Sequence, residues 1–285
     1  MRATHPLVSI GVPVFNEAAH IDAALASLRS QDYPNLEIIV CDNASTDETQ
    51  VICRRHAAED PRIRIEIAPV NRGVTANFRR AVDLASGEFF MWASGHDLWS
   101  PDFVSGCVEL LLEHPSASLA YASANWIGPD GQPYPRESGW SDTRGMEPAA
   151  RFFTVLWGSM NPVLGVMRLD RLRQCGSMPA IIGGDLVLLS ALALAGDFLH
   201  ARHCSWSRRE LRSEAHYGAK LARYTSPGFA VSRSWISRAF PLLRLPLALA
   251  NIVARSRIGW LDKSLLLLSL PMVLLLRYVV GRRAA

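Results

Sequence analysis

GEFFMWASGHDLWSP, residues Gly87–Pro101, combines an apolar run, a carboxylate and a helix start. Glu88 to Trp92 has the length and composition of a buried strand, and small residues, His96 and Asp97 follow it. Ser100 and the proline after it favour a helix start, with the serine as N-cap. A carboxylate between a strand end and a helix is a common position for a ligand site in an α/β sheet. Asp97 is therefore the first candidate for a site residue.

Apolar runs of strand length alternate with helical patterns on both sides of this stretch. We expect strands at Leu7–Val12, Leu36–Cys41, Ile63–Ile67, Glu88–Trp92 and Ser118–Ala122. We expect helices that begin near Glu17 and at a capping box, Ser45–Glu48, and helices over Val74–Ala85 and Pro101–Glu113. The alternation predicts βαβ units, and hence an α/β fold with a mostly parallel sheet and helices on both faces.

Polar residues follow four of the expected strands. Phe15 to Glu17, Asp42 with Asn43, Asn71 to Gly73, and His96 with Asp97 all come at strand ends. In a parallel sheet these ends share one edge, so the residues should converge in one crevice. The chain has neither a GxGxxG fingerprint after the first strand nor a GxxxxGK[ST] loop. If phosphates bind here, a divalent ion on Asp97 is a better candidate to hold them, because Mg²⁺ and Mn²⁺ prefer carboxylate and phosphate oxygens.

Four ordered blocks carry a family resemblance: VSIGVPVFNE, VCDNASTDET, NRGVTANFRRAVDLASGEFF and GHDLWSP. In this order and spacing the chain resembles family 2 glycosyltransferases of the GT-A fold, a Rossmann-like architecture. The resemblance covers residues 7–121 closely and extends more loosely to about residue 216. It implies a nucleotide-diphospho-sugar donor, UDP- or dTDP-linked, a divalent metal such as Mg²⁺ or Mn²⁺, and glycosyl transfer with inversion.

The resemblance also implies roles for individual residues. Pro13, Phe15 and Glu17 would border the nucleoside, with Phe15 stacked on the base, and Asp42 would accept a hydrogen bond from the base. Asn71 and Gly73 would line the loop beneath the nucleoside. Asp97 matches the metal-binding aspartate, whereas Gly95 and His96 stand where relatives carry carboxylates. His96 would bind the ribose or diphosphate, or act as a second metal ligand.

Each of these residues also has a structural interpretation. Asp42 could cap the next helix, and Asp97 could be a turn residue. His96 could be a loop histidine, Phe15 could belong to the core, and Asn71 with Gly73 could serve only the turn.

The second half has fewer signals. Residues 1–124 would form the nucleotide-sugar-binding half, and 125–215 the acceptor-binding and catalytic half of the same domain. Asn125 to Gly145 looks like a loop over the site, and Pro162 to Arg168 like a strand. Asp185 stands at the start of an apolar helix, a favourable place for any aspartate. The family resemblance puts the catalytic base at this kind of position. Arg208, Arg209 and His216, expected after a strand, could reach a diphosphate or an anionic acceptor, or form a solvated basic face.

Residues 216–285 form a basic, apolar C-terminal region for which we expect helices. Fifteen of the thirty basic residues, but only three of the twenty-six acidic ones, lie after residue 200. The apolar run Ser264–Leu276 is too short to span a bilayer, and its flanking arginines favour a helix in the membrane interface. Packing of residues 240–285 on the core or on a second subunit is the alternative. Five dispersed cysteines without a CxxC pair favour the reducing cytosol, and no secretory signal peptide is recognised.

Taken together, the sequence predicts an inverting glycosyltransferase of bacterial surface polysaccharide or glycolipid synthesis. We expect it in the cytoplasm, peripheral on the inner face of the cytoplasmic membrane, with a glycan or lipid-linked acceptor and no nucleic-acid partner. A non-catalytic nucleotide-sugar-binding protein, or a membrane adaptor of the same fold, is the alternative, because His96 reduces the acidity of the site.

Overall fold

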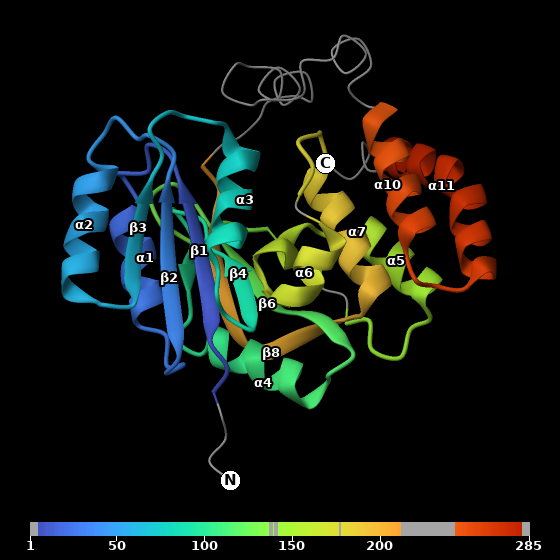
Figure 1. The fold of residues 1–285 in the computed structure, drawn as a ribbon, viewed down its shortest axis with the longest axis horizontal. Helices are drawn as coiled ribbons and strands as arrows, with labels where there is room; N and C mark the ends of the chain where they lie inside the picture. The colour runs from blue at the N-terminus through green and yellow to red at the C-terminus, as the bar shows by residue number, and fades with distance from the viewer. Residues whose placement is uncertain (1–4, 137–138, 140–141, 177, 212–242, 281–285) are drawn as a thin grey trace.

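The computed structural model describes residues 5–136, 139, 142–176, 178–211 and 243–280. Within them one eight-stranded sheet has the order β3-β2-β1-β4-β7-β6-β8-β5 (Figure 1). The strands are β1 (Val8–Val14), β2 (Leu36–Asp42), β3 (Ile63–Ile67), β4 (Phe89–Trp92), β5 (Leu98–Trp99), β6 (Ala117–Ile127), β7 (Val166–Arg168) and β8 (Asp197–Arg209). The helices are α1 (Ile21–Arg29), α2 (Thr49–Glu59), α3 (Val74–Leu84), α4 (Phe103–Glu113), α5 (Pro148–Trp157), the 3-10 helix η1 (Asn161–Leu164), α6 (Leu169–Cys175), α7 (Gly184–Ala195), α10 (Arg244–Arg255) and α11 (Trp260–Val280). The expected α/β class with a mostly parallel sheet is confirmed.

The β-branched strands at the centre bury both faces of the sheet. Ile38 and Val40 of β2 point to a core shared with α1, α2 and α4, whereas Ile39 and Cys41 point to a core shared with α3, α6 and α7. This alternation follows from the two-residue period of a strand. β1, β2, β3 and β4 pair in parallel, so their carboxyl ends share one edge. The strand-end residues of the first half therefore lie along that edge, as expected from the sequence.

Two expectations about the second half were wrong, one at β6 and one at the segment that begins at Pro162. β6 continues to Ile127 and pairs in parallel with β8, so the stretch expected as a loop from Asn125 onward begins as strand. Trp126 pairs with Arg208 there, and Trp126 is only 9% exposed. The pairing joins residues about eighty positions apart, which local composition cannot reveal. The expected strand from Pro162 instead starts as η1, and only Val166–Arg168 form β7.

Three helix starts differ from the sequence prediction. α1 begins at Ile21, four residues after Glu17, and α2 begins at Thr49. The hydroxyl of Ser45 accepts the backbone N–H of Asn16 at 2.9 Å instead of capping α2. α4 begins at Phe103, because the Ser100 hydroxyl donates to the Asp102 carboxylate rather than capping the helix. For α2 and α4 a loop contact outweighs the local capping pattern.

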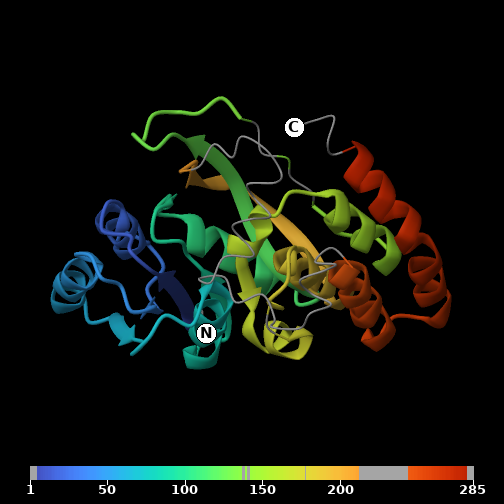
Figure 2. The same cartoon turned by 90° about the horizontal axis from the view of Figure 1, so that it is seen from above.

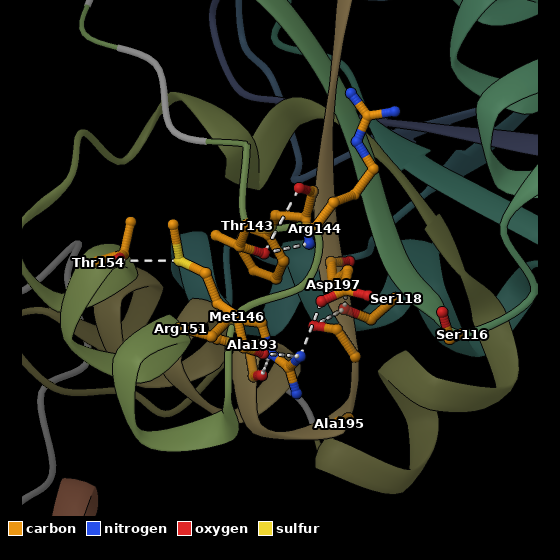
Figure 3. A network of polar contacts seen from close by, with 12 residues as sticks. Ser116, Ser118, Thr143, Arg144, Met146, Arg151, Thr154, Ala193, Ala195 and Asp197 are labelled. Atoms are coloured by element: carbon orange, nitrogen blue, oxygen red, sulfur yellow. Dashed lines mark hydrogen bonds and ion pairs between the residues drawn. The ribbon is translucent and has the colours of Figure 1, made fainter.

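The C-terminal end of α7 is held by a buried ion pair (Figure 3). Arg151 of α5 is 9% exposed, and its Nη1 donates to Asp197 Oδ1 at 2.8 Å while its Nε donates to the Ala193 carbonyl. Thr143 adds two contacts to Phe198. Its hydroxyl accepts the N–H of Phe198 at 2.8 Å, and its own N–H donates to the Phe198 carbonyl at 2.9 Å. Removing one partner of a buried pair is strongly destabilising, so this network fixes the end of α7 opposite to Asp185.

The last two helices pack on the outer side of α5 and α7, away from α2 (Figures 1 and 2). Leu266, Leu270 and Leu274 of α11 are almost fully buried at four-residue intervals, which is the spacing of one helix face. The packing on the core that the sequence left as an alternative is therefore present. No helix in the described part of the chain has the length and apolarity needed to cross a membrane. His216 and the rest of residues 212–242 lie outside the described residues.

Candidate active site

Asp97 occupies the loop that leads from the central strand β4 to the edge strand β5. It is 2% exposed. Its Oδ2 accepts the Ser94 hydroxyl at 2.5 Å, and its Oδ1 accepts the backbone N–H of Arg209 at 2.7 Å. Burial raises the pKa of the Asp97 carboxyl, while the neighbouring His96 and these two hydrogen bonds act in the opposite direction. The carboxylate is therefore held rigidly between the end of β4 and the end of β8.

His96 links two of the strand-end loops. Its Nδ1 lies 3.1 Å from Glu17 Oε1, which connects the loop after β4 to the loop after β1. The His96 carbonyl accepts Nε of Arg209 at 3.0 Å. The histidine thus contributes to the wall of the crevice and keeps Glu17 near the strand edge.

Asp185 lies in the first turn of α7. Gly183 precedes it with a φ of +78°, a left-handed conformation that suits glycine, and a Cβ there would meet Leu245 of α10 at 3.3 Å. Asp185 Oδ1 accepts the N–H of Leu186 at 2.8 Å. Its carboxylate is half-buried and lies at the N-terminal, positive end of the helix dipole.

One cavity of about 360 Å³ brings Asp97 and Asp185 together. Its polar lining residues come from five segments and are Thr75, Ser94, His96, Asp97, Asn161, Asp185, Arg208 and Arg209. Its apolar wall is formed mainly by Val74, Phe78, Met160, Val163, Leu164, Met178 and Ile181. A concave pocket with a few convergent charged groups is the arrangement expected of a substrate site.

The other six residues expected from the sequence lie at neighbouring strand ends and are not part of this cavity's lining. Pro13 is in β1, and Phe15 just beyond it is 43% exposed. Asp42 is 1% exposed and accepts both Gln50 Nε2 at 2.8 Å and the N–H of Ser45 at 3.1 Å.

The loop before α3 is organised by Asn71. Its Oδ1 accepts Asn43 Nδ2 and the N–H of Gly73, both at 2.8 Å. Gly73 caps α3 with a φ of +86°, which explains a glycine at this turn. The turn chemistry weighed from the sequence is therefore present.

Sequence reasoning missed how closely the end of β8 approaches Asp97. Arg208 and Arg209 were expected to follow a strand, but they are its last two residues and both line the cavity. Arg209 is separated from Asp97 by 112 positions, and no local pattern announces their hydrogen bond. Asn161, 6% exposed, also joins the cavity through η1 without a sequence signal.

The sequence was also compared with models of known protein families. The model for glycosyl transferase family 2 matches residues 9–162, more than half of the chain. The chain belongs to glycosyl transferase family 2. The family expected from the sequence is thereby confirmed.

Curated relatives resemble this family 2 protein over less than half of its length. A chondroitin synthase of Pasteurella multocida is 31% identical over 126 residues, which are 44% of this chain and 13% of the relative. The Campylobacter jejuni GalNAc(5)-diNAcBac-PP-undecaprenol beta-1,3-glucosyltransferase is 30% identical over 123 residues, 43% of this chain and 38% of the relative. The chain thus matches well under half of the length of either relative, both of which are named for glycan or glycolipid synthesis.

Solved structures extend the likeness to nearly the whole enzyme. Staphylococcus aureus TarS 1–349 in complex with UDP-GlcNAc superposes with a TM-score of 0.66 at 17% identity, over 92% of this chain and 70% of that one. The mannosyltransferase PcManGT from Pyrobaculum calidifontis, in complex with GDP-Man and Mn²⁺, gives 0.55 at 21% identity, over 95% and 81%. At such identities the likeness concerns the fold, which is the expected GT-A type.

Proposed function

We propose that this family 2 enzyme transfers a sugar, with inversion, from a nucleotide-diphospho-sugar to an acceptor hydroxyl. The observation that carries the proposal is that Asp97 and Asp185, 88 positions apart, line one cavity. Transfer with inversion needs a base near the incoming hydroxyl and a positive charge near the departing diphosphate, and a carboxylate can provide the latter by holding a metal ion. Structural neighbours in complex with UDP-GlcNAc and GDP-Man support a donor of this class, and a UDP- or dTDP-sugar is our first choice.

Asp185 is the proposed base. It accepts the proton of the acceptor hydroxyl as that oxygen bonds to the anomeric carbon, while the bond from this carbon to the diphosphate oxygen breaks. Its hydrogen bond to the N–H of Leu186 orients one carboxylate oxygen and leaves the other for the acceptor.

Asp97 is the proposed ligand of a divalent ion, Mg²⁺ or Mn²⁺. The described residues contain no cluster of three or more potential metal ligands. However, each Asp97 oxygen makes one hydrogen bond and keeps a second lone pair, and Asp97 faces the cavity. Magnesium commonly binds proteins through one or two carboxylates plus substrate phosphates, so the residues fit a one-carboxylate site. When bound, such an ion supplies positive charge to the leaving diphosphate.

The strand-end loops are the proposed nucleoside subsite. Phe15 has an exposed ring that can stack on a base, and it is flanked along the chain by Pro13 near the end of β1 and by Glu17 in the loop that follows. Asp42 would accept a hydrogen bond from the base, and Asn71 with Gly73 would support the nucleoside from below. His96, joined to Glu17, would contact the ribose or the diphosphate.

A thermal-shift screen tests the donor class. We expect UDP- or dTDP-sugars to raise the Tm of the enzyme, because a ligand that binds only the folded state stabilises it. The increase should be larger with Mn²⁺ than with EDTA. A free sugar and a nucleoside monophosphate serve as controls. An unchanged Tm with every nucleotide-diphospho-sugar, in the presence of Mn²⁺, would contradict the proposed function.

We further propose that the outer face of α11 lies in the membrane interface, near a lipid-linked acceptor. Large apolar side chains are exposed along it, including Leu268 at 83% and Met272 at 63%. The exposed large apolar residues of α11 are Trp260, Leu261, Leu265, Leu267, Leu268, Met272, Leu275 and Leu276. Arg255 and Arg257 are exposed just before α11 and would favour anionic lipid. The relative that is named for an undecaprenol-linked acceptor supports this placement.

Vesicle sedimentation tests this face. We expect the double variant Leu268→Glu/Met272→Glu to bind phosphatidylglycerol vesicles at least about tenfold more weakly than the wild type, because it inserts two charges into the apolar stripe. Val51→Glu, which alters an exposed valine on α2, is the matched control and should bind like the wild type. Unchanged sedimentation of the double variant would contradict the proposal. A wild-type dimer that this variant converts to a monomer, without a change in vesicle binding, would assign the face to a second copy instead.

A further inference from the structure

The last two residues of β8 are both arginines in the cavity, yet they are held very differently. Arg209 donates to three backbone carbonyls, those of His96, Gly128 and Pro129, at 3.0 to 3.2 Å. Its guanidinium is therefore used to join the loop after β4 to the loop after β6.

Arg208 is anchored from one side only. Its Nη1 donates to Asn161 Oδ1 at 2.5 Å, and its guanidinium carbon lies 4.7 Å from the centre of the Trp126 ring. This is the one hydrogen bond that its five N–H groups make to the described part of the chain, and no described carboxylate lies within salt-bridge distance of it. Stacking and one anchor fix the plane of the guanidinium, so its remaining N–H groups keep a defined direction.

The charges around Arg208 identify the kind of ligand it suits. It is half-buried and lines the same cavity as Asp97 and Asp185, the proposed ligand and base. Burial lowers its pKa, and the negative charges of Asp97, Glu210 and Asp185 counteract this effect. An arginine stays protonated in proteins, so a desolvated cation with unused donors faces the site. Planar guanidinium donors match phosphate oxygens and form strong charge-assisted hydrogen bonds with them.

We propose that Arg208 binds the diphosphate of the donor and of the released nucleotide directly, as a protein-borne cation beside the divalent ion. This inference rests on the proposed function and adds to it a phosphate-binding residue outside the strand-end loops. Arg208 also adds a positive charge to the cavity that contains His96, the residue that stands where relatives carry a carboxylate. Nucleotide binding consequently keeps a component that does not need the metal.

Calorimetric titration with UDP and uridine, in EDTA and in Mn²⁺, isolates the phosphate contribution. The wild type should bind UDP more tightly than uridine even in EDTA. Arg208→Gln should lower this UDP-to-uridine affinity ratio about ten- to a hundredfold in EDTA, the size of a lost charge-assisted contact, and leave uridine binding unchanged. Arg208→Lys, which keeps the charge but not the planar donors, should fall in between.

Arg136→Gln is the matched control. Arg136 also stacks on Trp126, at 4.2 Å, but it pairs with Glu210 and is not part of this cavity's lining. It should retain the wild-type ratio. If Arg208→Gln does not fold, Arg208→Met, which keeps the apolar stem over Trp126, carries the same test.

A wild-type ratio in a folded Arg208→Gln or Arg208→Met protein overturns the inference while leaving the proposed function intact. Failure of the wild type to bind UDP, dTDP or GDP under any condition instead overturns the proposed function, and the role of Arg208 with it. Should only guanosine nucleotides bind, the same comparison is made with GDP and guanosine.

Discussion

Asp185→Asn is expected to lower kcat by about 10²- to 10⁴-fold, the usual contribution of a general base, with little change in the KM for the donor. The amide oxygen can still accept the N–H of Leu186, so the start of α7 should keep its geometry. The amide cannot take the acceptor's proton, and the loss should therefore fall on the chemical step. Initial rates of nucleoside diphosphate release, measured with a saturating acceptor, check this result.

Asp170→Asn is a closely matched control. Asp170 also lies in the first turn of a helix, α6, and its Oδ1 accepts the N–H of the next residue at 2.7 Å. It is not part of the cavity lining, so its variant should retain the wild-type kcat. A kcat for Asp185→Asn within about threefold of the wild type would assign the base to another group.

Asp97→Asn is expected to abolish the Mn²⁺-dependent part of donor binding and most of the turnover. The amide can preserve both hydrogen bonds, because its oxygen accepts from Arg209 and its NH₂ group donates to the Ser94 hydroxyl. It supplies no negative charge to a metal ion, however. Titration of UDP with and without Mn²⁺ measures the difference, and Asp130→Asn, in an exposed loop, is the control.

The same variant should be at least as stable as the wild type at neutral pH. Burial raises the pKa of Asp97 in the folded state, so the folded protein holds this proton more tightly than the unfolded chain. The stability of the wild type therefore falls as the pH rises through the interval between the unfolded pKa, about 3.9, and the raised folded one. The asparagine does not titrate. The difference in Tm between the Asp97→Asn variant and the wild type should therefore shrink as the pH falls below this interval. A Tm well below that of the wild type at pH 7, or an intact response to Mn²⁺, would contradict the role given to Asp97.

The parallel half of the fold could be predicted because its signals are local. Buried β-branched runs such as Leu36–Cys41 have strand length and helices follow them, so their order along the chain already gives the shared edge. The approximate places of His96 and Asp97 followed from this rule. The start of α7 was equally visible, since Asp185 precedes a continuous apolar helix.

The remainder depends on contacts between distant segments. The antiparallel pairing of β5 with β8 joins Leu98 to Ser207, and together with the pairing of β6 with β8 it brings Arg208 and Arg209 to the site. The sequence of the C-terminal region likewise could not show that Leu266, Leu270 and Leu274 pack inward while Leu268 stays exposed. An all-round apolar helix has no preferred face until its neighbours are in place.

The parallel pairing of β6 with β8 limits how this enzyme can be divided or recombined. A fragment that ended at residue 162, where the family match ends, would leave β6 without either of its strand partners, β7 and β8, and Asp97 without the N–H of Arg209. Unpaired edges of this length invite aggregation. Asp97 accepts two hydrogen bonds, and one of the two donors, the N–H of Arg209, lies more than a hundred residues further along the chain. A chimera that exchanges the acceptor-side segment for that of a relative must therefore keep β8 together with the loop after β4 that it contacts.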